Sequence, residues 1–139
     1  MSTTIRQSID ASVVAQICET YKLTTAEFST LRQRSSAAKA TAYCPYSQFR
    51  VGATILAGDG QFVDGANVEN AAYPVGTCAE RVAFGKAVTE GKGKFRAVRY
   101  VSSQTSGEHV GKWEGNGLMK GIGSCFHGYH PTCESMWNV

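Results

Sequence analysis

Cys78 and Glu80, two residues apart, are the side chains of this sequence best suited to chemistry. Both fall at the start of an expected helix, where the helix dipole and unsatisfied backbone amides favour a thiolate. A thiolate there can bind a metal ion, and the carboxylate beside it can carry protons for a metal-bound water. A structural interpretation also exists, because Thr77 and Glu80 fit a capping box and a solitary cysteine is often a small buried residue. The local pattern leaves both interpretations open.

A second pair of polar residues, Asn67 and Glu69, precedes this helix. Residues two apart on an extended segment face the same side. An amide and a carboxylate together can bind a hydroxyl group that both donates and accepts a hydrogen bond. The alternative is a solvated strand end with a turn at Asn70. Phe49 raises a similar question, because it fits either the wall of a substrate site or ordinary core packing.

The elements expected around these residues alternate helices with strands, which defines the α/β class. Apolar spacings of three and four predict helices, and apolar runs between turn residues predict strands. Thr24 and Glu27 form a capping pair, and Gly52 inside a strand indicates close approach by a ligand or another backbone. We therefore expect helices packed on a mixed sheet. The expected elements are helices over 5–19, 24–42 and 78–90, a hairpin with strands over 49–56 and from 62, and a strand over 95–102.

Three segments resemble, in order and spacing, the small zinc-dependent cytidine deaminase family. They are residues 43–53 (YCPYSQFRVGA), 67–74 (NVENAAYP) and 78–81 (CAER). Residues 95–98 (FRAV) fit the next strand of the family, so the resemblance covers about residues 42–104. It implies a cytidine-deaminase-like layered fold and a hydrolase that converts cytidine or deoxycytidine to uridine or deoxyuridine. It also implies a small nucleoside substrate, a role in pyrimidine salvage and a homotetramer.

The resemblance further implies a role for each candidate residue. Cys78 resembles a zinc ligand, and Glu80 resembles the carboxylate that deprotonates zinc-bound water and then protonates the pyrimidine ring and the leaving amine. Arg81 resembles an arginine that offsets the negative charge of the thiolates. The implied substrate-binding residues are Phe49 against the substrate, Asn67 and Glu69 at the ribose hydroxyl, and the backbone of Ala79 at the base.

The second half of the family's zinc site is not found by its motif. A Pro-Cys-x-x-Cys motif is expected roughly 30 to 35 residues after the first ligand, but residues 108–113 read EHVGKW. Four other metal-capable side chains follow, namely Cys125, His127, His130 and Cys133. They fit donation to the Cys78 site, a separate local zinc site or a chance cluster. We therefore expect a cytidine-deaminase-like domain over 1–104 and a divergent Gly-rich tail over 105–139.

These observations leave more than one function open. The first is an active zinc-dependent cytidine deaminase. The alternative is a catalytically inactive, truncated or mis-spliced homologue that lacks two zinc cysteines and at most joins intact subunits. A third is a deaminase of a cytosine-containing antibiotic or another cytosine nucleoside analogue, because such enzymes share the core motifs.

Composition excludes several other classes of partner. The 139 residues include 14 Lys and Arg against 11 Asp and Glu, a net charge of +3 that gives no electrostatic reason to expect nucleic acid or membrane partners. No apolar run approaches the roughly 18 residues of a membrane helix. The N-terminal residues lack a secretory pattern, so we expect a cytoplasmic protein.

Overall fold

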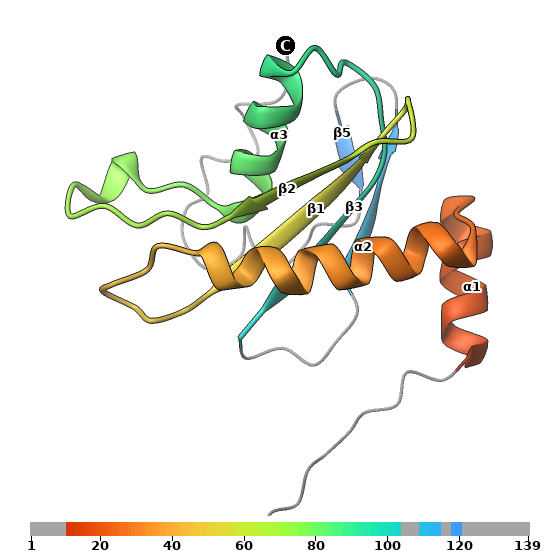
Figure 1. Ribbon diagram of the computed structural model, residues 1–139, viewed down its shortest axis with the longest axis horizontal. Coiled ribbons are helices and arrows are strands. Elements are labelled where there is room, and N and C mark those ends of the chain that lie inside the picture. The colour runs from red at the N-terminus through yellow and green to blue at the C-terminus, as the bar shows by residue number, and fades with distance from the viewer. Residues whose placement is uncertain (1–10, 104–108, 115–117, 121–139) are drawn as a thin grey trace, which may run out of the picture.

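The computed structural model describes residues 11–103, 109–114 and 118–120 of the chain. In these parts, helices cover both faces of a single sheet (Figure 1), and the expected α/β class is confirmed. The helices are α1 (Ala11–Tyr21), α2 (Thr25–Ala38) and α3 (Ala79–Thr89), with 3-10 turns η1 (Lys39–Thr41) and η2 (Tyr73–Val75). The strands are β1 (Val51–Ala57), β2 (Phe62–Ala66), β3 (Phe95–Ser102), β4 (His109–Glu114) and β5 (Leu118–Lys120).

The sheet has the strand order β2-β1-β3-β4-β5, and each neighbouring pair is antiparallel. The predicted hairpin is confirmed by the pairing of β1 with β2, in which Leu56 lies opposite Phe62. The expected mixed sheet is corrected to an antiparallel one for the described strands. The stretch between Ser102 and His109 is too short for the crossover of about a dozen residues that a parallel neighbour of β3 would require.

The expected helices form, with differences at their ends. The hydroxyl of Thr24 accepts from the Glu27 amide (3.1 Å) and the Glu27 carboxylate accepts from the Thr24 amide (2.9 Å), which confirms the capping box of α2. A hydrogen bond from Arg96 of β3, and then the bond from the Thr24 amide, hold the pKa of Glu27 below its ordinary value. The part of the first expected helix that precedes Ala11 lies outside the described residues. No helix in the described ranges is long and apolar enough to cross a bilayer.

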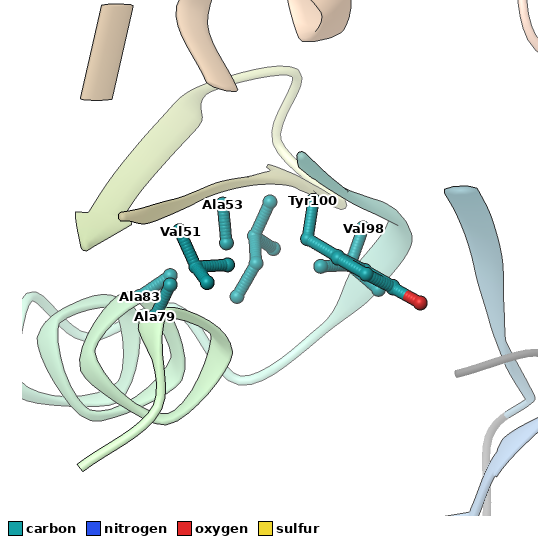
Figure 2. Close-up of a cluster of buried hydrophobic side chains, with 7 residues drawn as sticks. Val51, Ala53, Ala79, Ala83, Val98 and Tyr100 are labelled. Carbon is teal, nitrogen blue, oxygen red and sulfur yellow. The ribbon is translucent and has the colours of Figure 1, made fainter. Parts of the chain in front are cut away.

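The two larger clusters of buried hydrophobic residues lie on opposite faces of the sheet, and β1 is buried along its whole length between them. On one face lie Val51, Ala53, Ile55, Val98 and Tyr100 of the sheet with Ala79 and Ala83 of α3 (Figure 2). On the other face lie Leu56 and Ala97 of the sheet with Leu23, Phe28 and Leu31. Ala79, Ala83 and Ala87 of α3 are fully buried, and their small side chains let the helix pack close to the strands. Phe84 of the same helix packs edge to face on Phe95 of β3.

Two glycines allow this close packing. A Cβ atom added at Gly52 of β1 would lie 2.2 Å from the carbonyl oxygen of Ser35 in α2. A Cβ atom added at Gly65 of β2 would lie 2.4 Å from the carbonyl oxygen of Ala79 in α3. The close approach expected at Gly52 is therefore confirmed, and the approaching group is helix backbone. Gly65 likewise allows the backbone of α3 to approach the opposite face of the sheet, at the first turn of that helix.

Polar side chains join α2 to strands β2, β1 and β3. The guanidinium of Arg34 donates to both carboxylate oxygens of Asp64 (2.8–3.2 Å), and the Thr54 hydroxyl donates to the same carboxylate (2.7 Å). Burial raises the pKa of Asp64, but the bonds from Arg34 and Thr54 outweigh it, so the pKa lies below its ordinary value. Arg99 is buried and donates to the Ser35 hydroxyl. These bonds fix α2 on the face of the sheet opposite to α3.

The expected division of the chain at residue 104 stays a prediction. Of the expected tail, the structure describes 109–114 and 118–120, and these residues extend the sheet beyond β3 as β4 and β5. Cys125, His127, His130 and Cys133 lie outside the described residues.

Candidate active site

Cys78 and Glu80 lie at the start of α3, as the sequence predicts. Cys78 is the half-buried N-cap residue, and Glu80 in the first turn is only 4% exposed. The capping box considered for Thr77 and Glu80 is wrong, because the helix begins one residue later than that motif requires. Burying a carboxylate is unfavourable unless its charge is used or compensated. The burial of Glu80 therefore favours a chemical role over a capping role.

Two isolated β-bridges bring the other candidate segments to the start of α3. Val68 pairs with Thr77, where Val68 N–H donates to Thr77 O (3.0 Å) and Thr77 N–H to Val68 O (2.9 Å). Val68 also pairs with Tyr43, where Tyr43 N–H donates to Asn67 O (3.0 Å) and Glu69 N–H to Tyr43 O (2.7 Å). The three segments thus run side by side at the end of the sheet where β1 begins and β2 ends (Figure 1).

Phe49 packs against the core that contains Ala79. Its side chain is half-buried, whereas Ala79, the first residue of α3, is fully buried. Figure 2 shows the neighbouring side chains Val51 and Ala53 pointing from β1 toward Ala79 and Ala83 of that helix. Phe49 therefore packs in the core, as one of its two interpretations predicts. The cluster that it contacts includes Ala79, whose backbone is expected to contact the base.

Asn67 is bound to the chain just ahead of β1. Its Oδ1 accepts from Val51 N–H (2.8 Å), and its Nδ2 donates to Phe49 O (2.8 Å). The amide side chain thus pairs with the main chain as another strand would. The turn expected at Asn70 is present, because Asn70 Oδ1 accepts from Ala72 N–H (2.8 Å). The solvated strand end does not describe Asn67, whose side chain is half-buried and makes two hydrogen bonds.

Glu69 is bound to the same loop, a few residues earlier. Its Oε2 accepts from the amides of Tyr46 (3.0 Å) and Ser47 (3.2 Å), and its Oε1 accepts from the Ser47 hydroxyl. The Ser47 hydroxyl bond, together with those two amides, lowers the pKa of Glu69 against a weaker desolvation effect. Asn67 and Glu69 therefore turn toward one segment, as their spacing predicts. Ser47 was not predicted as a site residue. Its hydroxyl accepts from the backbone amide two residues later, which is a common turn motif of serine.

The described residues include side chains whose chemistry would suit part of a metal site. Cys78 is a thiol at a helix N-terminus with Glu80 buried nearby, which is donor chemistry that fits Zn²⁺. Arg81, half-buried, follows directly in α3. Within the ranges that the structure describes, no group of three or more His, Cys, Asp and Glu side chains lies together. The further ligands of a zinc ion would come from outside these ranges.

A metal-binding side chain two residues before a glutamate that is not a ligand is part of the signature of the zinc deaminases, and Cys78 and Glu80 have this spacing at the start of α3. The comparison of sequences agrees with the structure. A family model described as the cytidine and deoxycytidylate deaminase zinc-binding region matches residues 26–106. The chain belongs to this family.

Individual proteins similar to this chain are also cytidine deaminases. A cytidine deaminase of Sporosarcina psychrophila is 50% identical over 68 residues, which cover 49% of this chain and 50% of the relative. One of Halalkalibacterium halodurans is 48% identical over 65 residues, or 47% and 49% of the two chains. The chain thus matches about half the length of these curated relatives. None of them supports the alternative of an inactive truncated homologue.

Solved structures show the same likeness in three dimensions. The crystal structure of cytidine deaminase from Burkholderia pseudomallei has a TM-score of 0.53 and 42% identity, covering 56% of this chain and 62% of that one. The cytidine deaminase from Mycobacterium tuberculosis also has a TM-score of 0.53, with 40% identity, covering 54% and 61%. The cytidine-deaminase-like fold predicted from the sequence is therefore confirmed.

Proposed function

We propose that this chain catalyses the zinc-dependent hydrolytic deamination of cytidine or deoxycytidine. Water adds its oxygen to C4 of the ring and the amino group leaves, so the products are uridine or deoxyuridine and ammonia. The observation that carries the proposal is the buried Glu80 beside Cys78 at the start of α3, within the stretch that the zinc-binding family model matches. The cytidine deaminases that resemble the chain support the same substrate class.

Glu80 is the proposed general acid/base. Its carboxylate takes a proton from the attacking water, gives one to N3 of the pyrimidine, and helps to protonate the amine at C4 that leaves as ammonia. The C4–O bond forms and the C4–N bond breaks, with no oxidation or reduction. Because Glu80 is only 4% exposed, its carboxylate is shielded from bulk solvent.

Cys78 is the ligand that the described residues would supply to zinc. Zinc, when bound, acts as a Lewis acid that lowers the pKa of water to about 7. The N-terminal end of α3 favours the thiolate form of Cys78 that a metal requires. Arg81 is proposed to offset the negative charge that thiolate ligands bring. The remaining ligands are proposed to lie after residue 104, where the sequence places Cys125, His127, His130 and Cys133.

The nucleoside is proposed to bind between the two loops that meet the start of α3. Asn67 and Glu69 would bind a ribose hydroxyl, Phe49 would pack against the substrate, and the backbone of Ala79 would contact the base. Two observations support this: Asn67 and Glu69 both bond to the stretch over residues 47–51, and Phe49 packs against the core cluster that contains Ala79. A cytoplasmic homotetramer in pyrimidine salvage, without nucleic acid or membrane partners, completes the proposal and rests on the family.

A substrate panel tests this proposal. The full chain, purified with zinc present, is offered cytidine, deoxycytidine, free cytosine and a cytosine-containing nucleoside antibiotic, and ammonia release is measured. We expect kcat/KM for both natural nucleosides to exceed that for free cytosine by at least about tenfold, because the sugar contacts are lost with the free base. Turnover of the antibiotic alone would favour the analogue-specific enzyme instead. Turnover of none of them by folded, zinc-loaded protein would contradict the proposal.

A further inference from the structure

The main chain of Phe49 is held on both sides by polar side chains. Its N–H donates to the Ser47 hydroxyl (3.0 Å), and its carbonyl oxygen accepts from Asn67 Nδ2 (2.8 Å). The strand β1 begins only at Val51. At Phe49, side chains therefore make the backbone hydrogen bonds that a neighbouring strand makes within β1. The position of the Phe49 ring therefore depends on Ser47 and Asn67.

Ser47 also connects Phe49 to Glu69. A serine hydroxyl has one proton to donate and two lone pairs that accept. Ser47 gives its proton to Glu69 Oε1 and accepts from Phe49 N–H at 3.0 Å. One hydroxyl group thus bridges a proposed sugar ligand and the proposed aromatic wall. We call Ser47, Asn67 and Glu69 together the Phe49 clamp.

The loop inside the clamp has an unfavourable backbone conformation. Gln48, between Ser47 and Phe49, has a φ of 58°, in the left-handed region that residues other than glycine rarely adopt. The turn is held by Gln48 N–H to Cys44 O (3.1 Å) and Gln48 Nε2 to Pro45 O (2.9 Å). Such a conformation persists when surrounding bonds over-determine it. The clamp supplies those bonds from the sheet side.

The clamp keeps capacity for one further hydroxyl. A carboxylate has about four acceptor positions, and the described contacts of Glu69 use three of them. An Asn amide has two N–H groups, and the described contacts of Asn67 use one, toward Phe49. One acceptor position and one donor are what a single sugar hydroxyl needs. The groups that would recognise the sugar are therefore the same groups that hold Phe49.

We propose that Ser47 is a positioning residue for nucleoside binding, which couples the sugar-recognition pair Asn67 and Glu69 to the aromatic wall at Phe49. This inference rests on the proposed function, because it assumes that a nucleoside occupies the site. Ser47 acts through Glu69 and Phe49 and does not touch the reacting atoms. Its loss affects binding of the nucleoside and leaves the chemical step unchanged.

The test compares Ser47→Ala with Ser47→Thr, and uses Ser36→Ala, an exposed serine of α2, as a matched control. We expect Ser47→Ala to raise KM for cytidine about tenfold with kcat within about twofold, because a hydrogen bond to a charged group is lost. Ser47→Thr keeps the hydroxyl and restores KM, and Ser36→Ala changes neither constant. Adding Glu69→Ala to Ser47→Ala should raise KM further, because the direct sugar contact of Glu69 is also lost, but by less than the two single effects combined, because the two side chains belong to one network.

Two readouts separate this inference from the proposed function. Uridine binding measured by calorimetry should weaken in Ser47→Ala by the same factor as KM rises. The pKa of Glu69, followed by carboxyl ¹³C NMR, should increase in Ser47→Ala even if the chain deaminates nothing. An unchanged KM and uridine affinity in Ser47→Ala, or a fall in kcat alone, would overturn the inference. A wild-type chain that neither binds nor deaminates nucleosides, with the NMR shift present, would instead refute the proposed function.

Discussion

Glu80→Gln is expected to lower kcat for cytidine by at least about a hundredfold, because general acid/base groups contribute roughly 10²–10⁴ to the rate. Gln has nearly the same shape as Glu and can occupy the same buried position, but it cannot accept or deliver a proton. Because Glu80 is proposed as a proton carrier and not as a zinc ligand, the zinc content of Glu80→Gln should equal that of the wild type. Steady-state kinetics and metal analysis of the same preparations give both quantities.

Glu90→Gln is the matched control for this substitution. Glu90 is the exposed C-cap residue of the same helix and pairs only loosely with Lys92 (3.7 Å). Its replacement should leave kcat within about twofold, because an exposed ion pair contributes little. Wild-type turnover by Glu80→Gln, or loss of zinc together with turnover, would remove Glu80 from its assigned role.

Gly65→Ala is expected to damage the site through the position of α3. The new Cβ atom would lie 2.4 Å from the carbonyl oxygen of Ala79 and 2.5 Å from the amide nitrogen of Ala83. Both are backbone atoms, so the first turn of α3 must shift away from β2. We expect a loss of about 1–3 kcal/mol in the free energy of unfolding, together with weaker zinc binding and lower kcat/KM. Denaturant melts and zinc titrations measure the two effects separately.

Two other glycines serve as controls. Gly52→Ala meets α2 on the opposite face, with the Cβ atom 2.2 Å from Ser35 O and 2.4 Å from Lys39 N, and should destabilise similarly with little change in zinc affinity. Gly85 is exposed in α3 with open space around it, so Gly85→Ala should stabilise by roughly 0.5–1 kcal/mol. If Gly52→Ala weakens zinc binding as much as Gly65→Ala does, the site is not positioned through Gly65.

Local patterns predicted the elements that carry the candidate site. The capping pair Thr24 and Glu27 placed the start of α2, and Gly91, with its φ of 81°, ends the region of α3 as expected. The strand predicted over 95–102 agrees with β3. These features depend on neighbours a few residues apart, so a single sequence contains the information needed.

Features that depend on distant contacts were not predicted. Ser47 meets Glu69 across 22 positions of the chain, and no local pattern specifies that bond. Gly65 is explained only by the backbone of α3 that lies against it. The antiparallel attachment of β4 depends in the same way on its pairing with β3. The roles of Cys78, Glu80 and Arg81 came from a resemblance, and the structure adds their placement and burial.

The zinc content of the purified full chain tests the central proposal most directly, since hydroxide formation at neutral pH depends on the metal. The proposal predicts about one tightly bound zinc per chain, as a catalytic site with Cys78 and further protein ligands requires. Removal of that zinc by a chelator should abolish cytidine deamination, and restoring zinc should recover it. Folded protein that holds no zinc, or that deaminates cytidine equally well after the metal is removed, would contradict the account.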